Sequence, residues 1–182
     1  MNEIERKRAA NLWEPFVRKF PPVAKSCDFT ASPEIGFGDI GGLEEAKDEL
    51  LTYACAATDP DVYERWGTFP PSGLLLIGPN GSGKTLLAAA LATRTETPFL
   101  VIRAPRLALQ ILHAGGKIGD LLQAWQETLA EIKRITVYFD ELDFAHDPSL
   151  GAPRPDLPAS QLGDFLLELI DVTIGVTETL ML

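Results

Sequence analysis

A glycine-rich segment of the pattern G-x-x-x-x-G-K-[ST] is the feature that most constrains the fold of this chain. It consists of Gly78, Pro79, Asn80, Gly81, Ser82, Gly83, Lys84 and Thr85. Glycines allow a tight turn in which successive backbone N–H groups point into one concavity that suits an anion. Because such a loop depends on a strand before it and on the positive end of a helix after it, the pattern predicts an α/β fold.

The residues on either side of this loop predict both of the elements that it requires. Residues 74–77 are a short apolar run suited to a strand buried on both faces, and the Ala- and Leu-rich residues 84–94 predict a helix. Further elements are predicted at residues 43–57 (helix), 98–103 (strand), 117–132 (helix), 135–139 (strand), 160–170 (helix) and 172–182 (β-prone tail). Strands that alternate with helices indicate a three-layer sandwich of the P-loop NTPase class, with helices on both faces of a parallel sheet.

The N-terminal part of the chain predicts a helix and a linker ahead of this α/β domain. Residues 1–20 have apolar positions at helical spacing, interrupted at Pro15, and the two prolines that follow end the helix because proline lacks the N–H group. Residues 26–42 are rich in glycine and predict a loop. We therefore expect residues 1–36 to be a helix and linker, and residues 37–182 to form the α/β domain.

Two side chains of the glycine-rich loop have chemical roles in phosphate binding. Lys84 can reach the β- and γ-phosphates of a nucleotide, and the hydroxyl of Thr85 can be a ligand of Mg²⁺. We include Leu86, the next residue of the predicted helix, among the nucleotide-binding positions. The alternative is a glycine-rich turn that binds nothing. A second glycine pattern, G-x-G-x-x-G at residues 36–41, does not follow a strand and is rejected as a dinucleotide site.

Two acidic residues, Asp140 and Glu141, follow the predicted strand at residues 135–139. The carboxyl ends of parallel strands share one edge of a sheet with the phosphate loop, and ligands bind in the crevice outside that edge. We expect Asp140 to hold Mg²⁺, directly or through water, and Glu141 to polarise a water for in-line attack on the γ-phosphate. The pair therefore favours hydrolysis over phosphoryl transfer to a small molecule. The alternative is that the two acids only solvate a strand end.

Composition and charge argue against a nucleic-acid partner and against a membrane segment. The chain has a formal net charge of −10, but its first 25 residues have six basic and three acidic side chains. The remaining residues have 10 basic and 23 acidic side chains, a net charge of −13 that repels a phosphate backbone. No apolar run reaches the roughly 18 residues of a membrane helix. Two cysteines without metal or disulfide spacing predict a cytoplasmic protein.

Four motifs in order resemble those of the AAA+ ATPases, in particular the unfoldase branch with valosin-containing-protein-like and proteasomal members. They are DIGGLEEAK at 39–47, PPSGLLLIGP at 70–79, GKTLLA at 83–88 and FDELD at 139–143. The resemblance implies ATP and Mg²⁺ as cofactors and an ATP-hydrolysing domain that remodels or unfolds a protein substrate, directly or through an adaptor. It also implies a homo-oligomeric ring, a hexamer. In that family the Ile-Gly pair of the first motif lies against adenine, which assigns Ile40 and Gly41 to base recognition.

The sequence departs from the family pattern where polypeptide-threading members place an aromatic–hydrophobic–glycine triplet in a pore loop. That position falls on residues 114–116, Ala-Gly-Gly, where the aromatic residue is missing although His113 is adjacent. A nucleotide-dependent binding or switch module with weak or no hydrolysis is therefore the alternative function, while the intact Glu141 favours the enzyme. A transporter-type ATPase is set aside, because no Leu-Ser-Gly-Gly-Gln signature precedes the acidic pair.

The resemblance also implies elements that would follow this sequence: a strand ending in a polar sensor residue, arginine fingers and a helical lid. Residues 179–182 match the beginning of that strand. We therefore expect a partial large nucleotide-binding subdomain, truncated before the sensor strand and the lid. Because arginine fingers contribute roughly 10³–10⁵ in rate in comparable hydrolases, we expect the 182-residue chain alone to hydrolyse ATP weakly or not at all.

Overall fold

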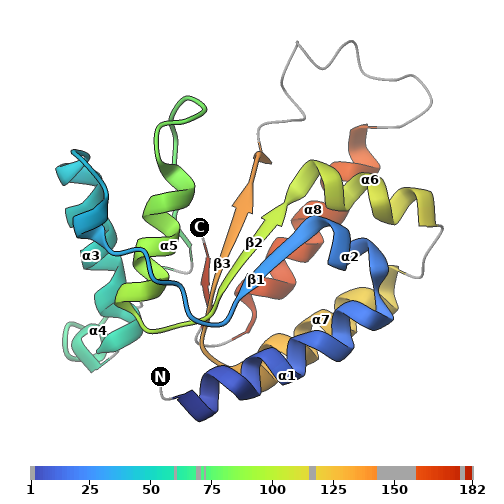
Figure 1. Ribbon diagram of the computed structural model, residues 1–182, viewed down its shortest axis with the longest axis horizontal. Coiled ribbons are helices and arrows are strands. Elements are labelled where there is room, and N and C mark those ends of the chain that lie inside the picture. Colours follow the sequence, from blue (N-terminus) through green and yellow to red (C-terminus); the bar gives the residue numbers. More distant parts are fainter. Residues whose placement is uncertain are drawn as a thin grey trace.

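Four strands form one sheet in the computed structural model, which describes residues 3–59, 61–68, 71, 73–114, 118–142, 159–176 and 179–181 (Figure 1). In sheet order they are β1 (Cys27–Thr30), β2 (Phe99–Arg103), β3 (Ile135–Asp140) and β4 (Thr179–Met181). β1 runs antiparallel to β2, whereas β3 is parallel to both β2 and β4. The three parallel strands therefore direct their carboxyl ends to the same edge of the sheet.

Helices cover both faces of this sheet (Figure 1). On one side lie the 3-10 helix η1 (Phe37–Asp39), α3 (Glu44–Thr58) and α5 (Lys84–Arg94), and the short α4 (Asp61–Arg65) follows α3. On the other side lie α1 (Glu3–Lys19), α2 (Pro21–Ser26), α6 (Ala104–Ala114), α7 (Ile118–Ile132) and α8 (Ala159–Ile174). This arrangement confirms the predicted α/β class. None of the helices in the described ranges is long and apolar enough to cross a bilayer.

The two faces have separate hydrophobic cores because successive residues of a strand point to opposite sides of the sheet. On β3, Val137 and Phe139 belong to the cluster with α7 and α8, whereas Tyr138 belongs to the cluster with α3 and α5. On β2, Leu100 and Ile102 belong to the first of these clusters. The apolar side chains that follow one another along these strands therefore enter both cores in turn, as expected for buried parallel strands.

Most of the elements predicted around the glycine-rich loop are confirmed. α3, α5, α7 and α8 and the strands β2 and β3 lie within a few residues of the ranges predicted from periodicity. The predicted β tail is right only for β4, because α8 continues to Ile174. α6 was not predicted, although its buried residues Leu107, Ala108 and Ile111 have helical spacing.

The predicted strand at residues 74–77 is wrong. This segment has no regular secondary structure and lies outside the sheet, and Leu75 and Ile77 are 73% and 88% exposed. An apolar run becomes a buried strand only where a neighbouring strand offers it a ladder of hydrogen bonds. In the described part of the chain, residues 74–77 pair with no strand. The sheet ends at β4, which is three residues long and pairs with β3 alone.

Two predictions for the N-terminal part are also wrong. Part of the expected loop at residues 26–42 is the strand β1, because Cys27–Thr30 pairs with β2 in antiparallel register. The helix predicted to be interrupted at Pro15 is continuous through that residue as α1. Tertiary packing outweighs the missing N–H group there, since Trp13 and Phe16 of the same helix are buried in the core. The two prolines after Lys19 do end α1, but they begin α2.

An aromatic cluster attaches α1 to the core. The ring of Trp13 lies 5.3 Å from those of Phe16 and Phe29 and 5.9 Å from that of Trp125, as ring centroids. Such pairs add about 0.5–1.5 kcal/mol each beyond the area that they bury. The Trp125 indole N–H also donates a hydrogen bond of 3.0 Å to the Thr173 hydroxyl of α8. The cluster therefore joins α1, β1 and α7, while the division of the chain at residue 36 stays a prediction.

We predict that Trp13→Ala destabilises the chain strongly. Trp13 is 7% exposed, and truncation of a buried tryptophan costs about 3–5 kcal/mol in free energy of unfolding. Urea denaturation followed by circular dichroism measures this loss. Trp66→Ala is the matched control, because Trp66 is 79% exposed and its truncation is expected to change stability by less than about 0.5 kcal/mol. Equal losses for the two variants would contradict the packing of α1 against α7.

We predict that Cys27 resists alkylation in the folded chain. Burial is the main cause that raises the pKa of its thiol to about 12; Asp28 adds to the rise and Arg103 opposes it. The reactive thiolate is therefore nearly absent at pH 8. Mass spectrometry after iodoacetamide treatment at pH 8 is expected to find Cys55, which is partly exposed, modified well before Cys27. In urea both should react, and equal rates without urea would refute the burial of β1.

Candidate functional site

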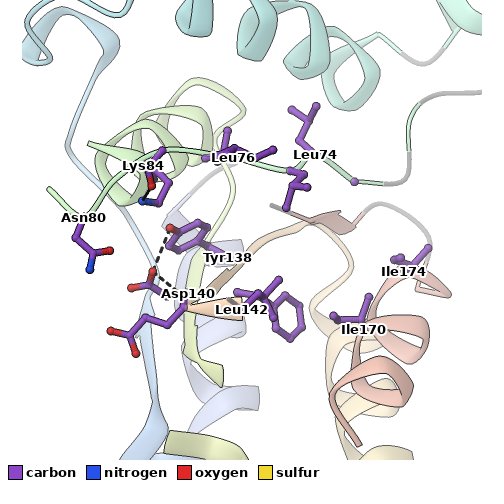
Figure 2. Close-up of a pocket in the computed structure, with 15 residues that line it drawn as sticks. Leu74, Leu76, Asn80, Lys84, Tyr138, Asp140, Leu142, Ile170 and Ile174 are labelled. Atoms are coloured by element: carbon purple, nitrogen blue, oxygen red, sulfur yellow. Dashed lines mark hydrogen bonds between the residues drawn. The ribbon is translucent and has the colours of Figure 1, made fainter. Parts of the chain in front are cut away.

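The carboxyl end of β3 and the glycine-rich loop before α5 meet at a pocket of about 650 Å³ (Figure 2). Its polar end is lined by Asn80, Lys84, Asp140 and Glu141. Its apolar end is lined by Leu74, Leu76, Leu142, Ile170 and Ile174. A concave site with an apolar wall and a few converging polar groups is the usual form of a small-molecule binding site.

The glycine-rich loop has the backbone geometry that its sequence predicts. Gly81 and Gly83 have φ angles of 80° and 94°, in the left-handed region that other residues rarely adopt. The N–H of Ser82 donates to the Pro79 carbonyl at 3.2 Å and closes a turn, and the N–H of Leu87 donates to the Gly83 carbonyl at 2.9 Å. The loop therefore leads directly into the first turn of α5, where unpaired N–H groups and the helix dipole favour an anion.

Backbone carbonyl groups of the glycine-rich loop hold the side chain of Lys84 against the loop. Its ammonium group donates hydrogen bonds of 2.7 Å to the Gly78 carbonyl and 3.0 Å to the Pro79 carbonyl. Figure 2 shows the side chain between the loop and the end of β3. The positive charge therefore lies at the polar end of the pocket, together with the carboxylates of Asp140 and Glu141.

The two acids at the end of β3 have different surroundings. One oxygen of Asp140, Oδ1, accepts hydrogen bonds from the Tyr138 hydroxyl at 3.2 Å and from the Glu141 N–H at 3.1 Å. Glu141 is exposed and has a φ of 61°, so the chain leaves the sheet at this residue. Asp140 is therefore orientated by its neighbours, whereas Glu141 reaches towards solvent at the rim of the pocket.

Tyr138 is a site residue that sequence reasoning missed. Only 3% of its surface is exposed, and it lines the pocket two residues before Asp140. Burial is the main cause that raises the pKa of its phenol; a hydrogen bond with the Thr85 side chain opposes the rise, and Asp140 and Glu141 add to it. The available signal was the alternation of β3, which places Tyr138 and Asp140 on one face of the strand.

Ile40 and Gly41 do not line this pocket in the described part of the chain. Ile40 is 7% exposed and packs into the core of α3 and α5, and its carbonyl accepts a 2.7 Å hydrogen bond from the buried ammonium group of Lys47. A Cβ atom on Gly83 would lie 3.5 Å from the Leu43 side chain. The segment therefore lies beside the phosphate loop, and its contact with adenine stays a prediction.

The other predicted residues fall into two groups. Gly78 lines the pocket, and the following lie in the loop or in the first turn of α5 without lining it: Pro79, Gly81, Ser82, Gly83, Thr85 and Leu86. The pore-loop triplet at residues 114–116 and the His113 side chain lie outside the described residues, except that the backbone of Ala114 ends α6. Their role in gripping a polypeptide stays a prediction.

The donor set near the pocket fits a magnesium ion bound together with phosphates. Within the described residues no group of three or more His, Cys, Asp or Glu side chains could enclose a metal. Mg²⁺ in nucleotide sites needs no such cage, since it uses one or two protein oxygens, substrate phosphates and water. Asp140, which accepts a hydrogen bond from Tyr138, and the Thr85 hydroxyl in the first turn of α5 are oxygen donors of that kind.

Comparison with known proteins identifies relatives over most of the chain. Proteasome-activating nucleotidase from Saccharolobus islandicus is 30% identical over 156 residues, which cover 85% of this chain and 37% of the relative. The same-named protein from Methanocella arvoryzae is 35% identical over 137 residues, 74% of this chain and 31% of the relative. Proteasome-activating nucleotidase 1 from Halobacterium salinarum is 35% identical over 122 residues, 66% of this chain and 29% of the relative. The matched part of the chain thus spans between 29% and 37% of the length of these relatives.

The comparison with protein families covers the part of the chain that forms the pocket. Residues 74–173 match the ATPase family associated with various cellular activities (AAA). The matched segment includes the glycine-rich loop, Tyr138 and the acidic end of β3, and it amounts to more than half of the 182 residues. The chain therefore belongs to the AAA family of ATPases.

Proposed function

We propose that this chain binds and hydrolyses ATP with Mg²⁺ and that hydrolysis drives the remodelling or unfolding of a protein partner. The observation that carries the proposal is the convergence of Lys84, Asp140 and Glu141 on one pocket beside the glycine-rich loop. A cation for phosphates, a carboxylate for a metal and a second carboxylate for water are the parts that nucleotide hydrolysis needs. AAA family membership supports the same reaction.

The proposed roles follow from position. The N–H groups of the loop and of the first turn of α5 bind phosphate oxygens, and Lys84 neutralises their charge. Thr85 and Asp140 hold Mg²⁺, which polarises the phosphoryl group. Glu141 orientates a water for attack on the γ-phosphate, a role for which its exposed position at the rim of the pocket is suited.

The proposed partner is a protein, and the proposed assembly is a homo-oligomeric ring, a hexamer, in the cytoplasm. The support comes from relatives whose names describe nucleotidases that activate the proteasome. The charge of −13 beyond the first 25 residues makes a nucleic-acid partner unfavourable. The missing aromatic residue at 114–116 favours a second candidate, a nucleotide-dependent switch with weak or no hydrolysis. Binding of ATP without turnover would support that second function.

Lys84→Ala is predicted to weaken binding of Mg·ATP by about 10- to 100-fold, because it removes charge-assisted contacts with the phosphates. Isothermal titration calorimetry on the 182-residue chain measures the change. Lys25→Ala is the control, since Lys25 is exposed on α2 and does not line the pocket. Equal affinities of parent and Lys84→Ala for Mg·ATP would exclude the phosphate role of the loop.

Glu141→Gln is predicted to preserve ATP binding and to lower turnover by about 10²–10⁴-fold, since the amide cannot accept a proton from water. Because the parent rate is expected to be low, release of labelled phosphate is followed over hours with ATP affinity measured in parallel. Glu49→Gln, an exposed change on α3, is the control. The hydrolytic role of Glu141 is wrong if Glu141→Gln turns ATP over at the parent rate.

A further inference from the structure

Tyr138 lies where the two elements of the proposed nucleotide site meet. It is buried in the hydrophobic cluster that β3 forms with α5, to which Leu87, Ala88 and Leu91 also belong. Its hydroxyl points towards the carboxyl end of β3, as Figure 2 shows. A buried phenol needs a hydrogen-bond partner, and this one finds it in Asp140, which is proposed to bind Mg²⁺.

The hydrogen bond of the phenol has a defined direction. Its O–H donates to Asp140 Oδ1 at 3.2 Å. A carboxylate oxygen accepts and a phenol O–H donates, so the chemistry of the two groups agrees with this direction. The bond therefore fixes one oxygen of the Asp140 carboxylate.

We propose that Tyr138 is a positioning residue that orientates Asp140 for Mg²⁺. The inference rests on the proposed function, because it assigns Asp140 to the metal. The phenol donates its hydrogen to Asp140 Oδ1, and the ring of Tyr138 is itself buried. A side chain that is fixed by the core therefore sets the direction in which the carboxylate faces.

Because the phenol binds only Oδ1 of Asp140, the second carboxylate oxygen is available to bind the metal. Oδ1 already accepts from the Tyr138 hydroxyl and from the Glu141 N–H, and these two bonds limit rotation of the carboxylate. In dedicated protein sites, loss of an outer hydrogen bond that orientates a metal ligand typically lowers metal affinity 10- to 100-fold. The effect here is expected to be smaller, because phosphates and water supply most of the Mg²⁺ ligands.

The first test compares Tyr138→Phe with the parent chain. Phenylalanine keeps the ring and its packing but removes the hydrogen bond to Asp140. We expect affinity of the ATP-loaded chain for Mn²⁺, measured by electron paramagnetic resonance as a probe for Mg²⁺, to fall by about three- to tenfold. Affinity for ATP in EDTA is expected to stay within about twofold of the parent value, because the phosphate loop is intact.

Tyr53→Phe is the matched control. Tyr53 is 2% exposed and belongs to the same hydrophobic cluster, but it does not line the pocket. Its removal should leave Mn²⁺ affinity at the parent value. A loss of Mn²⁺ affinity of the same size in Tyr53→Phe, or a parallel loss of metal-free ATP binding in Tyr138→Phe, would overturn the inference in favour of a purely structural role.

A second measurement needs no substitution at position 138. The chain has three tyrosines, Tyr53, Tyr63 and Tyr138, so 3-fluorotyrosine labelling gives three ¹⁹F resonances that Tyr→Phe variants at 53 and 63 assign. Addition of Mg²⁺ to the ATP-bound chain is expected to shift the Tyr138 resonance and leave the other two unchanged. An unmoved Tyr138 resonance would overturn the inference.

The outcomes separate this inference from the proposed function. If the parent binds ATP more tightly with Mg²⁺ than in EDTA and Tyr138→Phe behaves identically, the proposed function stands and the role of Tyr138 is wrong. If the parent binds no ATP under either condition, the proposed function fails, and the role of Tyr138 fails with it.

Discussion

The structure depends on β3 being buried on both faces and paired on both edges. Its neighbours are β2 and β4, its residues from Ile135 to Phe139 are buried, and alternate side chains enter the two hydrophobic cores. A hydroxyl contact of 2.7 Å between Thr136 and Thr97 also ties the strand to the residues just after α5. Because β3 has so little freedom, the position of Asp140 at the end of the strand follows from packing that lies far from solvent.

The sequence predicted the parts of the site that depend on local chemistry. The loop, the start of α5 and the acidic end of β3 were predicted because glycine spacing and apolar periodicity act over a few residues. Tyr138 was not predicted as a site residue, because its place in the site depends on the packing of α5 against β3. That packing is a contact between segments far apart in the chain. The same holds for residues 74–77 and for β1, where pairing, rather than propensity, decides whether a segment is a strand.

The N-terminal segment shows how tertiary packing can extend a domain beyond its recognised motifs. α1 lies outside the family match at residues 74–173, yet it provides Trp13 and Phe16 to the core that supports β3. Pro15 is tolerated in α1 because the aromatic contacts of the helix outweigh the one backbone hydrogen bond that proline cannot donate. The basic residues of α1 and α2 lie on this appended segment, so charge is separated between the segment and the acidic remainder of the chain.

The hydrogen bonds of Lys84 to its own loop would make the proposed binding of a nucleotide an exchange reaction. The ammonium group already donates to two carbonyls, so a phosphate contributes only the difference between its attraction and theirs. A neutral carbonyl competes weakly with a triphosphate that carries several negative charges. It competes better with ligands of lower charge, such as a monophosphate. In the proposed function, such a loop would favour nucleotides with more phosphates, through a contact that Lys84 makes with its own loop.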